Sequence, residues 1–294
     1  MPDSFFTHSP EWRWWIVFYF FIGGISGGAF ALAALLRLFG RPGDHPISRL
    51  GYFIAFPGSV ISGLLLILDL KRPERFWHML IQSETLQPAF KWWSPISIGS
   101  WGLLGFGFFA FLTFVGALAE IGVLPRGLAA LVNGPLGALV NVLGGFAGFF
   151  LAGYTGVLLS TTNRPLWSDT VWLGLLFLVS GFSTGAALLI LLSWRSNAPA
   201  IQWLKELDSW TLVLELLVLV ILLASVGTAV LRPVLFNAWG ILLLVGVVLV
   251  GILVPLALHF RPVLGRLTVP SAAVLVLIGG FILRVVMLLS SEAV

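Results

Sequence analysis

A string of residues that could transfer protons and attract anions follows the second apolar run of this sequence. Asp69 is succeeded by Lys71, Arg72 and Arg75, and then by His78. Aspartate and histidine act as proton acceptors and donors in many sites, and grouped basic side chains attract anionic partners. A simpler interpretation stays open, in which Asp69 pairs with Lys71 at an interface and His78 is only solvated.

The elements that carry this string are long apolar segments. The chain has 294 residues, of which 59% are hydrophobic and 10% charged, with a mean hydropathy of +1.05; a soluble domain has about 25% charged residues. A membrane-spanning helix needs about 20 mostly apolar residues. The first run is too long for a signal-peptide core and is expected to be retained in the cell membrane. We expect an all-α transmembrane fold of eight helices, at about 14–37, 47–70, 97–120, 135–161, 170–194, 208–231, 236–259 and 269–290.

An even number of spans assigns each polar residue to one face. Tyr19, Asp69 and Tyr154 fall on the side of the termini, and Arg284 lies in the same half of the last span. Polar residues within spans are costly in lipid, so their clustering favours a functional site there, although tyrosines at span ends are also typical of the interfacial belt. The opposite face carries Glu120, Asp208, Glu215 and His259. Near the midplane we expect only Ser26, Ser183 and Thr184.

The basic residues predict which side the termini occupy. Connections on the face opposite the termini carry eight Arg and Lys residues and the terminus face carries seven, so the raw count does not decide the orientation. Four of those seven lie in the segment 71–91, and without this segment the count is eight to three. We therefore expect both termini on the non-cytoplasmic side.

Two of the spans share a short motif. Residues 24–29 and residues 181–186 both read Gly-x-Ser-x-Gly-Ala, four residues after a phenylalanine. Two parallel repeats of four helices would produce such a repeated motif. Two separate stripes of small residues at helix contacts would also produce it. Both explanations stay open.

These segments resemble the membrane subunits of the NrfD/polysulfide reductase type, over almost the whole chain. The most specific match is the acidic and basic string after the second span, whereas the glycine-rich pieces alone would be weak. The matching segments are Tyr19-x-Phe21-x-Gly23-Gly24, Asp69-Leu70-Lys71-Arg72-Pro73-Glu74-Arg75-Phe76, Ser94-Pro95-x-Ser97, Gly153-Tyr154-Thr155-Gly156, Ser183-Thr184-Gly185-Ala186-Ala187 and Gly279-Gly280-Phe281-x-x-Arg284.

The resemblance implies a subunit of a respiratory oxidoreductase complex that exchanges electrons with an exchangeable quinone, either menaquinone or ubiquinone. It implies two four-helix bundles, at residues 1–165 and 166–294, with the quinone near the outer face of the first. Asp69 or His78 would accept a proton from the quinol, and the tyrosines would orient its head group. The implied quinone-binding residues are Tyr19, Asp69, His78 and Tyr154.

The resemblance also implies a ferredoxin-like iron–sulfur subunit at the outer face, joined to a molybdopterin catalytic subunit. Lys71, Arg72, Arg75 and Lys91, within the segment 71–93, would form the docking loop. This protein would oxidise quinol or reduce quinone and would not act on the soluble substrate. Nucleic acid is not an expected partner, because the other basic residues are scattered singly among short loops.

The residue types also bear on cofactors and on an alternative function. The chain has no cysteine, which excludes a cysteine-ligated iron–sulfur cluster within it. None of its four histidines is expected in mid-span, which argues against haem with axial histidine pairs, and no metal site is expected. An eight-helix secondary transporter remains the alternative function. A proton route or a helix pairing through Glu120, Glu215 and Arg284 is a weaker hypothesis.

Overall fold

The computed structural model describes residues 12, 14–196, 199–261 and 265–292, and its long elements are helices. Within these residues, eight helical segments are long and apolar enough to cross a membrane, which confirms the all-α transmembrane fold class. They are α1 (Trp14–Phe39), α2 (His45–Asp69), α3 (Pro95–Glu120), α4 (Gly134–Ser160), α5 (Leu173–Ser193), α6 (Pro199–Ser225), the string α8 (Ala238–Ile241), η4 (Leu242–Leu253) and α9 (Val254–Phe260), and α10 (Thr268–Leu289). Shorter elements are η1 (Pro42–Asp44), η2 (Pro73–Met79), η3 (Arg126–Leu131), α7 (Thr228–Leu235), η5 (Gly265–Leu267) and η6 (Ser290–Glu292).

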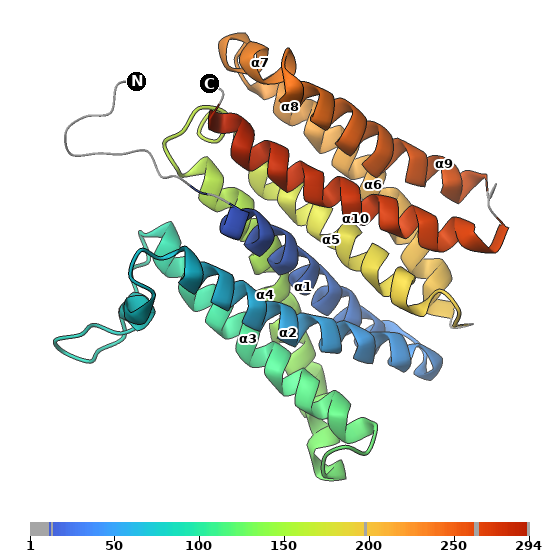
Figure 1. Cartoon of the computed structure of the whole chain (residues 1–294). Coiled ribbons are helices and arrows are strands. Elements are labelled where there is room, and N and C mark those ends of the chain that lie inside the picture. The colour runs from blue at the N-terminus through green and yellow to red at the C-terminus, as the bar shows by residue number, and fades with distance from the viewer. Residues whose placement is uncertain (1–11, 13, 197–198, 262–264, 293–294) are drawn as a thin grey trace.

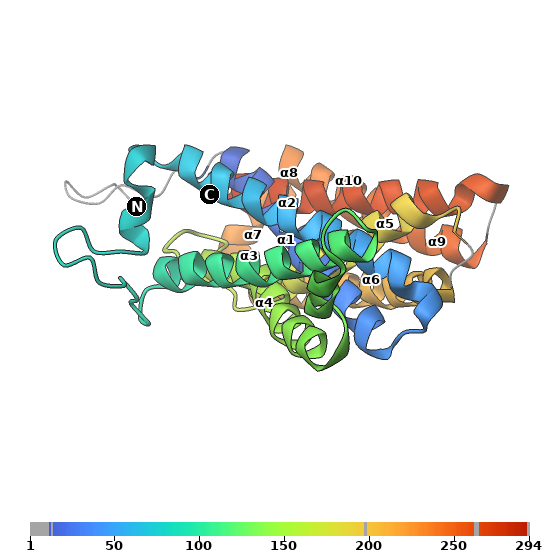
Figure 2. The same cartoon turned by 90° about the horizontal axis from the view of Figure 1, so that it is seen from below.

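The long helices lie side by side, and α1 and α5 occupy the centre (Figure 1). Helix α1 packs against α2, α4 and α5, whereas α5 packs against α1, α4, α6 and α10. Seen from below, α1 lies between α3 and α4 on one side and α10 on the other (Figure 2). Helix α1 begins and α10 ends at the same end of the molecule, which we call the terminus end, and η2 lies there too. The terminal residues 1–11, 293 and 294, whose side of the membrane was predicted, lie outside the described residues.

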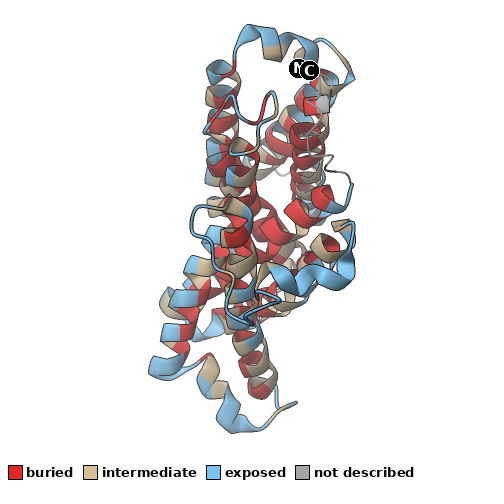
Figure 3. Ribbon diagram, turned by 90° about the vertical axis from the view of Figure 1, so that its left-hand side faces the viewer, coloured by how far each residue is buried: buried red, intermediate tan, exposed pale blue. Residues whose placement is uncertain are grey.

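The outward faces of the helices are apolar. Buried residues follow the faces that pack together, and exposed residues cover the outside (Figure 3). Many exposed side chains are large hydrophobic ones, such as Leu64, Phe108, Phe146 and Leu217. An apolar surface of this kind is unfavourable in water and suits a lipid environment.

The two copies of the Gly-x-Ser-x-Gly-Ala motif pack directly against each other. A Cβ atom added to Gly28 would lie 2.2 Å from the carbonyl oxygen of Gly181, and one added to Gly185 would lie 2.7 Å from the backbone nitrogen of Ala29. The backbones of α1 and α5 therefore approach so closely that only glycine fits. Gly24 also faces Gly181, since a Cβ on Gly24 would lie 3.6 Å from the Cα of Gly181. Helix packing thus explains both motifs, and the pairing of corresponding residues is also what two parallel repeats would give.

The sixth span differs from the prediction. Helix α6 begins at Pro199, not near 208, so Lys205 lies inside the helix and Asp208 is buried with 1% of its surface exposed. The charges around Asp208 resembled a loop in the sequence, but they lie on different faces of one helix. The predicted break at Arg232 lies within the short helix α7. The other seven spans begin within three residues of the predicted positions.

Candidate functional site

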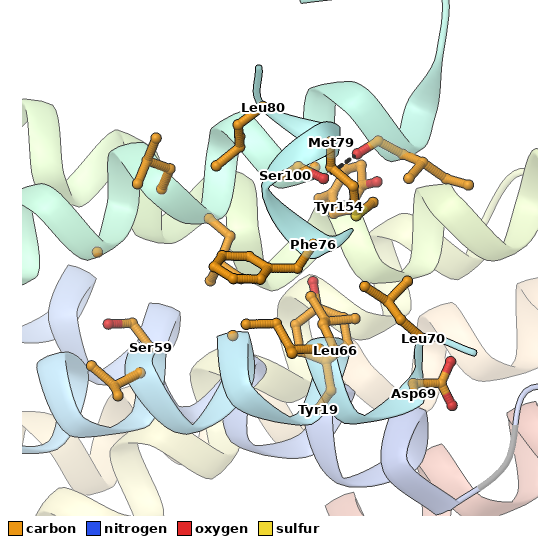
Figure 4. Close-up of a pocket in the computed structure, with 18 of the residues that line it drawn as sticks. Tyr19, Ser59, Leu66, Asp69, Leu70, Phe76, Met79, Leu80, Ser100 and Tyr154 are labelled. Carbon is orange, nitrogen blue, oxygen red and sulfur yellow. Dashed lines mark hydrogen bonds between the residues drawn. The ribbon is translucent and has the colours of Figure 1, made fainter. Parts of the chain in front are cut away.

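A cavity of about 630 Å³ lies among α1, α2, α3 and α4 at the terminus end, and η2 lies over it (Figure 4). Most of its lining is apolar. The polar side chains that line it come from all four helices: Tyr19, Ser59, Asp69, Ser100 and Tyr154. The structure therefore brings together three of the four residues that the sequence assigned to a quinone site.

Tyr154 is held in place by the first turns of α3. Its hydroxyl donates a hydrogen bond to the carbonyl oxygen of Pro95, and its ring stacks on Phe150 with 5.3 Å between the centroids. Ser94 caps α3 by accepting a hydrogen bond from the backbone nitrogen of Ser97, and Pro95 begins the helix. A Cβ on Gly99 would lie 2.1 Å from the Tyr154 hydroxyl, so the missing side chain makes room for the phenol.

Tyr19 reaches the same cavity from α1. Its side chain is only 2% exposed, and its hydroxyl points into the cavity (Figure 4). Among the described residues this hydroxyl has no hydrogen-bond partner, so it is available to a ligand. Trp12 also lines the cavity and stacks on Trp167, with 5.2 Å between the ring centroids. The Trp167 indole donates to the carbonyl oxygen of Met287 at 2.7 Å, which anchors this wall to α10.

Asp69 lies at the edge of the cavity. It is the last residue of α2 and is partly exposed, and its carboxylate turns away from the centre of the cavity (Figure 4). It forms no ion pair with Lys71, and no other described residue bonds to it. The position lets the carboxylate contact both a ligand edge and water, which a proton acceptor needs.

His78 and the basic residues lie outside the cavity. His78 belongs to η2, is exposed, and contacts the Trp77 ring at 3.9 Å between centroids. It does not line the cavity, although Phe76, Met79 and Leu80 from the same segment do. The basic residues of this loop are all exposed to solvent: Lys71, Arg72, Arg75 and Lys91.

A second polar cluster lies in the interior between α5, α6 and α10. Arg284 is fully buried; it donates to the hydroxyl of Ser180 and, at 2.9 Å, to the carbonyl oxygen of Gly280. Its guanidinium also lies 5.4 Å from the centroid of the Phe177 ring. Glu215 of α6 is buried and interacts electrostatically with Ser180 and Arg284. The sequence placed Glu215 and Arg284 at opposite faces, whereas in the structure the two buried side chains lie close enough to interact electrostatically.

More polar residues lead from this region toward the end opposite the termini. Ser183 donates to Asp208 at 2.9 Å, and His259 lies 4.0 Å from the other carboxylate oxygen of Asp208. The second ring nitrogen of His259 is 2.9 Å from the hydroxyl of Ser209. His259 and Ser209 line a smaller cavity of about 300 Å³, together with Gln202, Lys205 and Glu206. The ionisable residues inside the molecule are thus more numerous than the sequence indicated.

Glu120 does not join this series. It lies at the end of α3 and pairs with Arg37 of α1. Its carboxylate also accepts from Asn133 at 2.8 Å, and Arg49 lies 3.9 Å away. These contacts tie α1, α2 and α3 together.

Sequence reasoning gave no site role to three residues that shape these sites. Ser100 lines the cavity, Gly99 makes room for Tyr154, and Ser180 accepts a hydrogen bond from Arg284. Ser100 follows Ser97 by three residues, so the helical period was a signal that could have found it. Ser180 lies just before the Gly-x-Ser-x-Gly-Ala motif and has no such signal.

Comparisons with known proteins place this geometry in a family. A family model described as polysulphide reductase, NrfD, matches residues 4–294. A selenate reductase subunit of Mesobacillus selenatarsenatis is 38% identical over 102 residues, which represent 34% of this protein and 21% of that subunit. Protein NrfD of Escherichia coli is 30% identical over 219 residues, or 66% of this protein and 64% of the relative.

The protein thus spans less than two thirds of the length of these two relatives in the regions that match. One of the polysulfide reductase chains of Wolinella succinogenes is 31% identical over 233 residues, which represent 72% of this protein and 68% of the relative. The resemblance found in the sequence is confirmed, since the family model extends over nearly the whole length. With its eight candidate membrane spans, the protein belongs to the NrfD polysulphide reductase family of membrane subunits.

Proposed function

We propose that this protein exchanges electrons between a membrane quinone and an iron–sulfur partner subunit in a respiratory oxidoreductase complex. The observation that carries the proposal is the cavity among α1 to α4, which is polar at the terminus end and apolar elsewhere. A quinone has the same division between a polar head group and an apolar tail. Two relatives are named as single components of reductases with several subunits, which supports a place in a larger complex.

The side chains at the polar end have the chemistry that quinol oxidation needs. Oxidation of one quinol releases two electrons and two protons. Tyr19 and Tyr154 can hold the oxygens of the head group by hydrogen bonds, while Asp69 accepts the two protons one after the other at the edge of the cavity and passes each to water. His78 lies outside the cavity, so its part in proton transfer would be indirect.

The docking loop has a suitable position for the partner. Lys71, Arg72, Arg75 and Lys91 are exposed in the segment that also covers the cavity. An acidic face on a ferredoxin-like subunit would be attracted to these charges, and its cluster would then lie near the quinone head group. A molybdopterin subunit would carry the reaction on the soluble substrate. Docking there agrees with termini on the non-cytoplasmic side, and external protease should therefore remove terminal tags from intact cells.

The proposal includes two four-helix bundles, at residues 1–165 and 166–294. The pairing of Gly24 with Gly181, and of Gly28 with Gly185 and its neighbours, supports it. Two parallel repeats related by an axis along the membrane normal would bring corresponding residues together in this way.

Proton translocation is a second candidate activity, favoured by the polar residues between the smaller cavity and the interior. His259, Asp208 and Ser183 are separated by distances of 4.0 and 2.9 Å, and Glu215 lies further along α6. If protons use this route, Glu215→Gln should slow quinone-dependent proton uptake by reconstituted vesicles while assembly is unchanged. Equal uptake in that variant would remove the route. An ion-coupled transporter would also use such residues, but the family membership favours the reductase subunit.

The test of the electron-transfer proposal is turnover of the complex purified with its native partners. Quinol-driven activity should depend on the residues at the polar end of the cavity. Activity with an artificial dye donor should not, because the dye delivers electrons to the partner directly. A complex with dye-driven activity but no quinol-driven activity in its unaltered form would overturn the proposal.

A further inference from the structure

The cavity is longer than a head group needs. Its lining on α2 includes Phe56, Ser59, Gly63, Leu66 and Asp69, which recur at the three- and four-residue spacing of one helix face. The opposing face of α3 supplies a similar stripe from Ile96 to Phe111. From Phe56 to Asp69 this makes a slot about 20 Å long at 1.5 Å per residue. The hydrocarbon core of a bilayer is about 30 Å thick, so the slot reaches past its middle.

The lining of the slot changes from polar to apolar along its length. Tyr19, Asp69, Ser100 and Tyr154 all lie toward the terminus end, and beyond them Ser59 is the only hydroxyl among the lining residues. The deep end closes on packed rings, since Phe56 lies 5.3 Å from Phe111 and 5.1 Å from Phe114 between centroids. Along the side, exposed residues mark where the slot meets the lipid: Val60, Leu104, Phe108 and Phe111.

Two glycines keep this slot open. A Cβ on Gly63 would have no atom within 4 Å, and one on Gly107 would meet only the hydroxyl of Ser59 at 3.7 Å. They differ from Gly28, where a Cβ would lie 2.2 Å from backbone. Gly63 and Gly107 therefore are not needed for helix contact. The missing side chains of Gly63 and Gly107 leave empty space in the slot.

We propose that the slot between α2 and α3 binds the prenyl tail of the quinone, and that Gly63 and Gly107 set the width available to that tail. This rests on the proposed function and names a second part of the same site. A linear apolar tail attached to a neutral polar head matches the slot from its polar end to its phenylalanine floor. The competing occupant is a phospholipid acyl chain. Inside the cavity its phosphate would meet the carboxylate of Asp69, and no Lys, Arg or His of the described residues lines the cavity.

The experiment compares two quinols on the complex reconstituted in vesicles of one neutral phospholipid. One quinol carries a long prenyl tail and the other carries a single prenyl unit, with the same head group. The variants are Gly63→Leu and Gly107→Leu, which fill the slot. The control is Gly105→Leu, because a Cβ on Gly105 also meets nothing within 4 Å but this residue does not line the cavity.

Filling the slot should raise the KM for the long-tailed quinol by about tenfold or more, the range that steric exclusion from an apolar pocket commonly gives. The short quinol should keep its unaltered KM in both variants, and Gly105→Leu should change neither. Equal losses with both quinols would mean that the leucines block the head group, and no loss with either would mean that the tail lies elsewhere. Both results would overturn the proposal, as would loss of bound phospholipid from the variants with both KM values unchanged. Failure of the proposed function is distinct, since the unaltered complex would then oxidise neither quinol.

Discussion

The two halves of the molecule meet where α1 packs against α5, but the interiors on either side of this contact differ. A Cβ on Gly181 of α5 would lie 3.2 Å from the side chain of Ala152, whereas a Cβ on Gly24 of α1 would lie 3.2 Å from the guanidinium of Arg284. Around α1 to α4, small and apolar residues leave a large cavity. Around α5, α6 and α10, the buried side chains of Arg284 and Glu215 take up the interior. The comparison teaches that the same close approach of backbones can support either a ligand site or a fixed charge cluster.

The largest expected effect comes from substitutions at the polar end of the cavity among α1 to α4. Asp69→Asn should reduce quinol-driven turnover by a factor of about 10² to 10⁴, the usual cost of losing an acid–base group. Tyr154→Phe loses one hydrogen bond to the head group and should reduce this turnover by about tenfold. Neither substitution changes the shape of the cavity. Dye-driven turnover of the same purified complex should stay at its unaltered level. If both activities disappear together, the residues maintain assembly and do not contact quinol.

His78→Ala is the matched comparison for that experiment. The sequence alone predicts a loss as large as that from Asp69→Asn. The structure predicts a smaller one, because the imidazole lies against Trp77 and outside the cavity. A full loss of quinol-driven turnover in His78→Ala, with dye-driven turnover intact, would return His78 to the head-group site.

The next effect concerns the charge cluster. Arg284→Met removes the cation that interacts electrostatically with buried Glu215, and with it the hydrogen bonds to Ser180 and Gly280, whose loss costs about 1 to 3 kcal/mol. The thermal midpoint of the purified protein should therefore fall. Adding Glu215→Gln should recover part of this loss, because the double variant no longer buries a carboxylate without a nearby cation. If the double variant is as unstable as Arg284→Met alone, the two residues are not coupled.

A smaller effect separates the two kinds of glycine. Gly28→Ala forces a methyl group against the backbone of α5, and overpacking of this sort costs about 1 to 3 kcal/mol. Gly63→Ala places the same methyl group in open space and should leave the thermal midpoint nearly unchanged. Unfolding curves of both variants in one detergent would measure this. Similar destabilisation by both would show that the slot between α2 and α3 is packed.

The sequence was sufficient to predict eight apolar helices and to assign to one end three residues that line the cavity. Span-end positions and an even number of spans were enough to bring Tyr19, Asp69 and Tyr154 to one end, because these facts do not depend on how the helices rotate. The Glu215–Arg284 cluster does depend on helix rotation and on the start of α6, and charges in the first turns of α6 hid that start. His78 lies in a loop without periodicity, so no pattern indicated which way its ring would turn.

The smallest expected effect concerns partner docking, where charge acts over a distance and not through one fitted contact. Replacing Lys71, Arg72, Arg75 and Lys91 by glutamine should slow association with the iron–sulfur subunit by about tenfold at low salt, and the difference should shrink as salt screens the charges. The exposed residues Arg41, Arg126, Arg261 and Arg266 lie in the connections at the opposite end, so replacing these four by glutamine is the matched control and should not change the rate. Association can be followed by binding of the purified partner to the immobilised membrane subunit.

The glutamine substitutions leave Phe76 and Met79 at the cavity, so oxidation of quinol by the preassembled complex should be unaltered. Equal slowing by both sets of substitutions would assign the effect to overall charge, and the loop would then have no special part in docking.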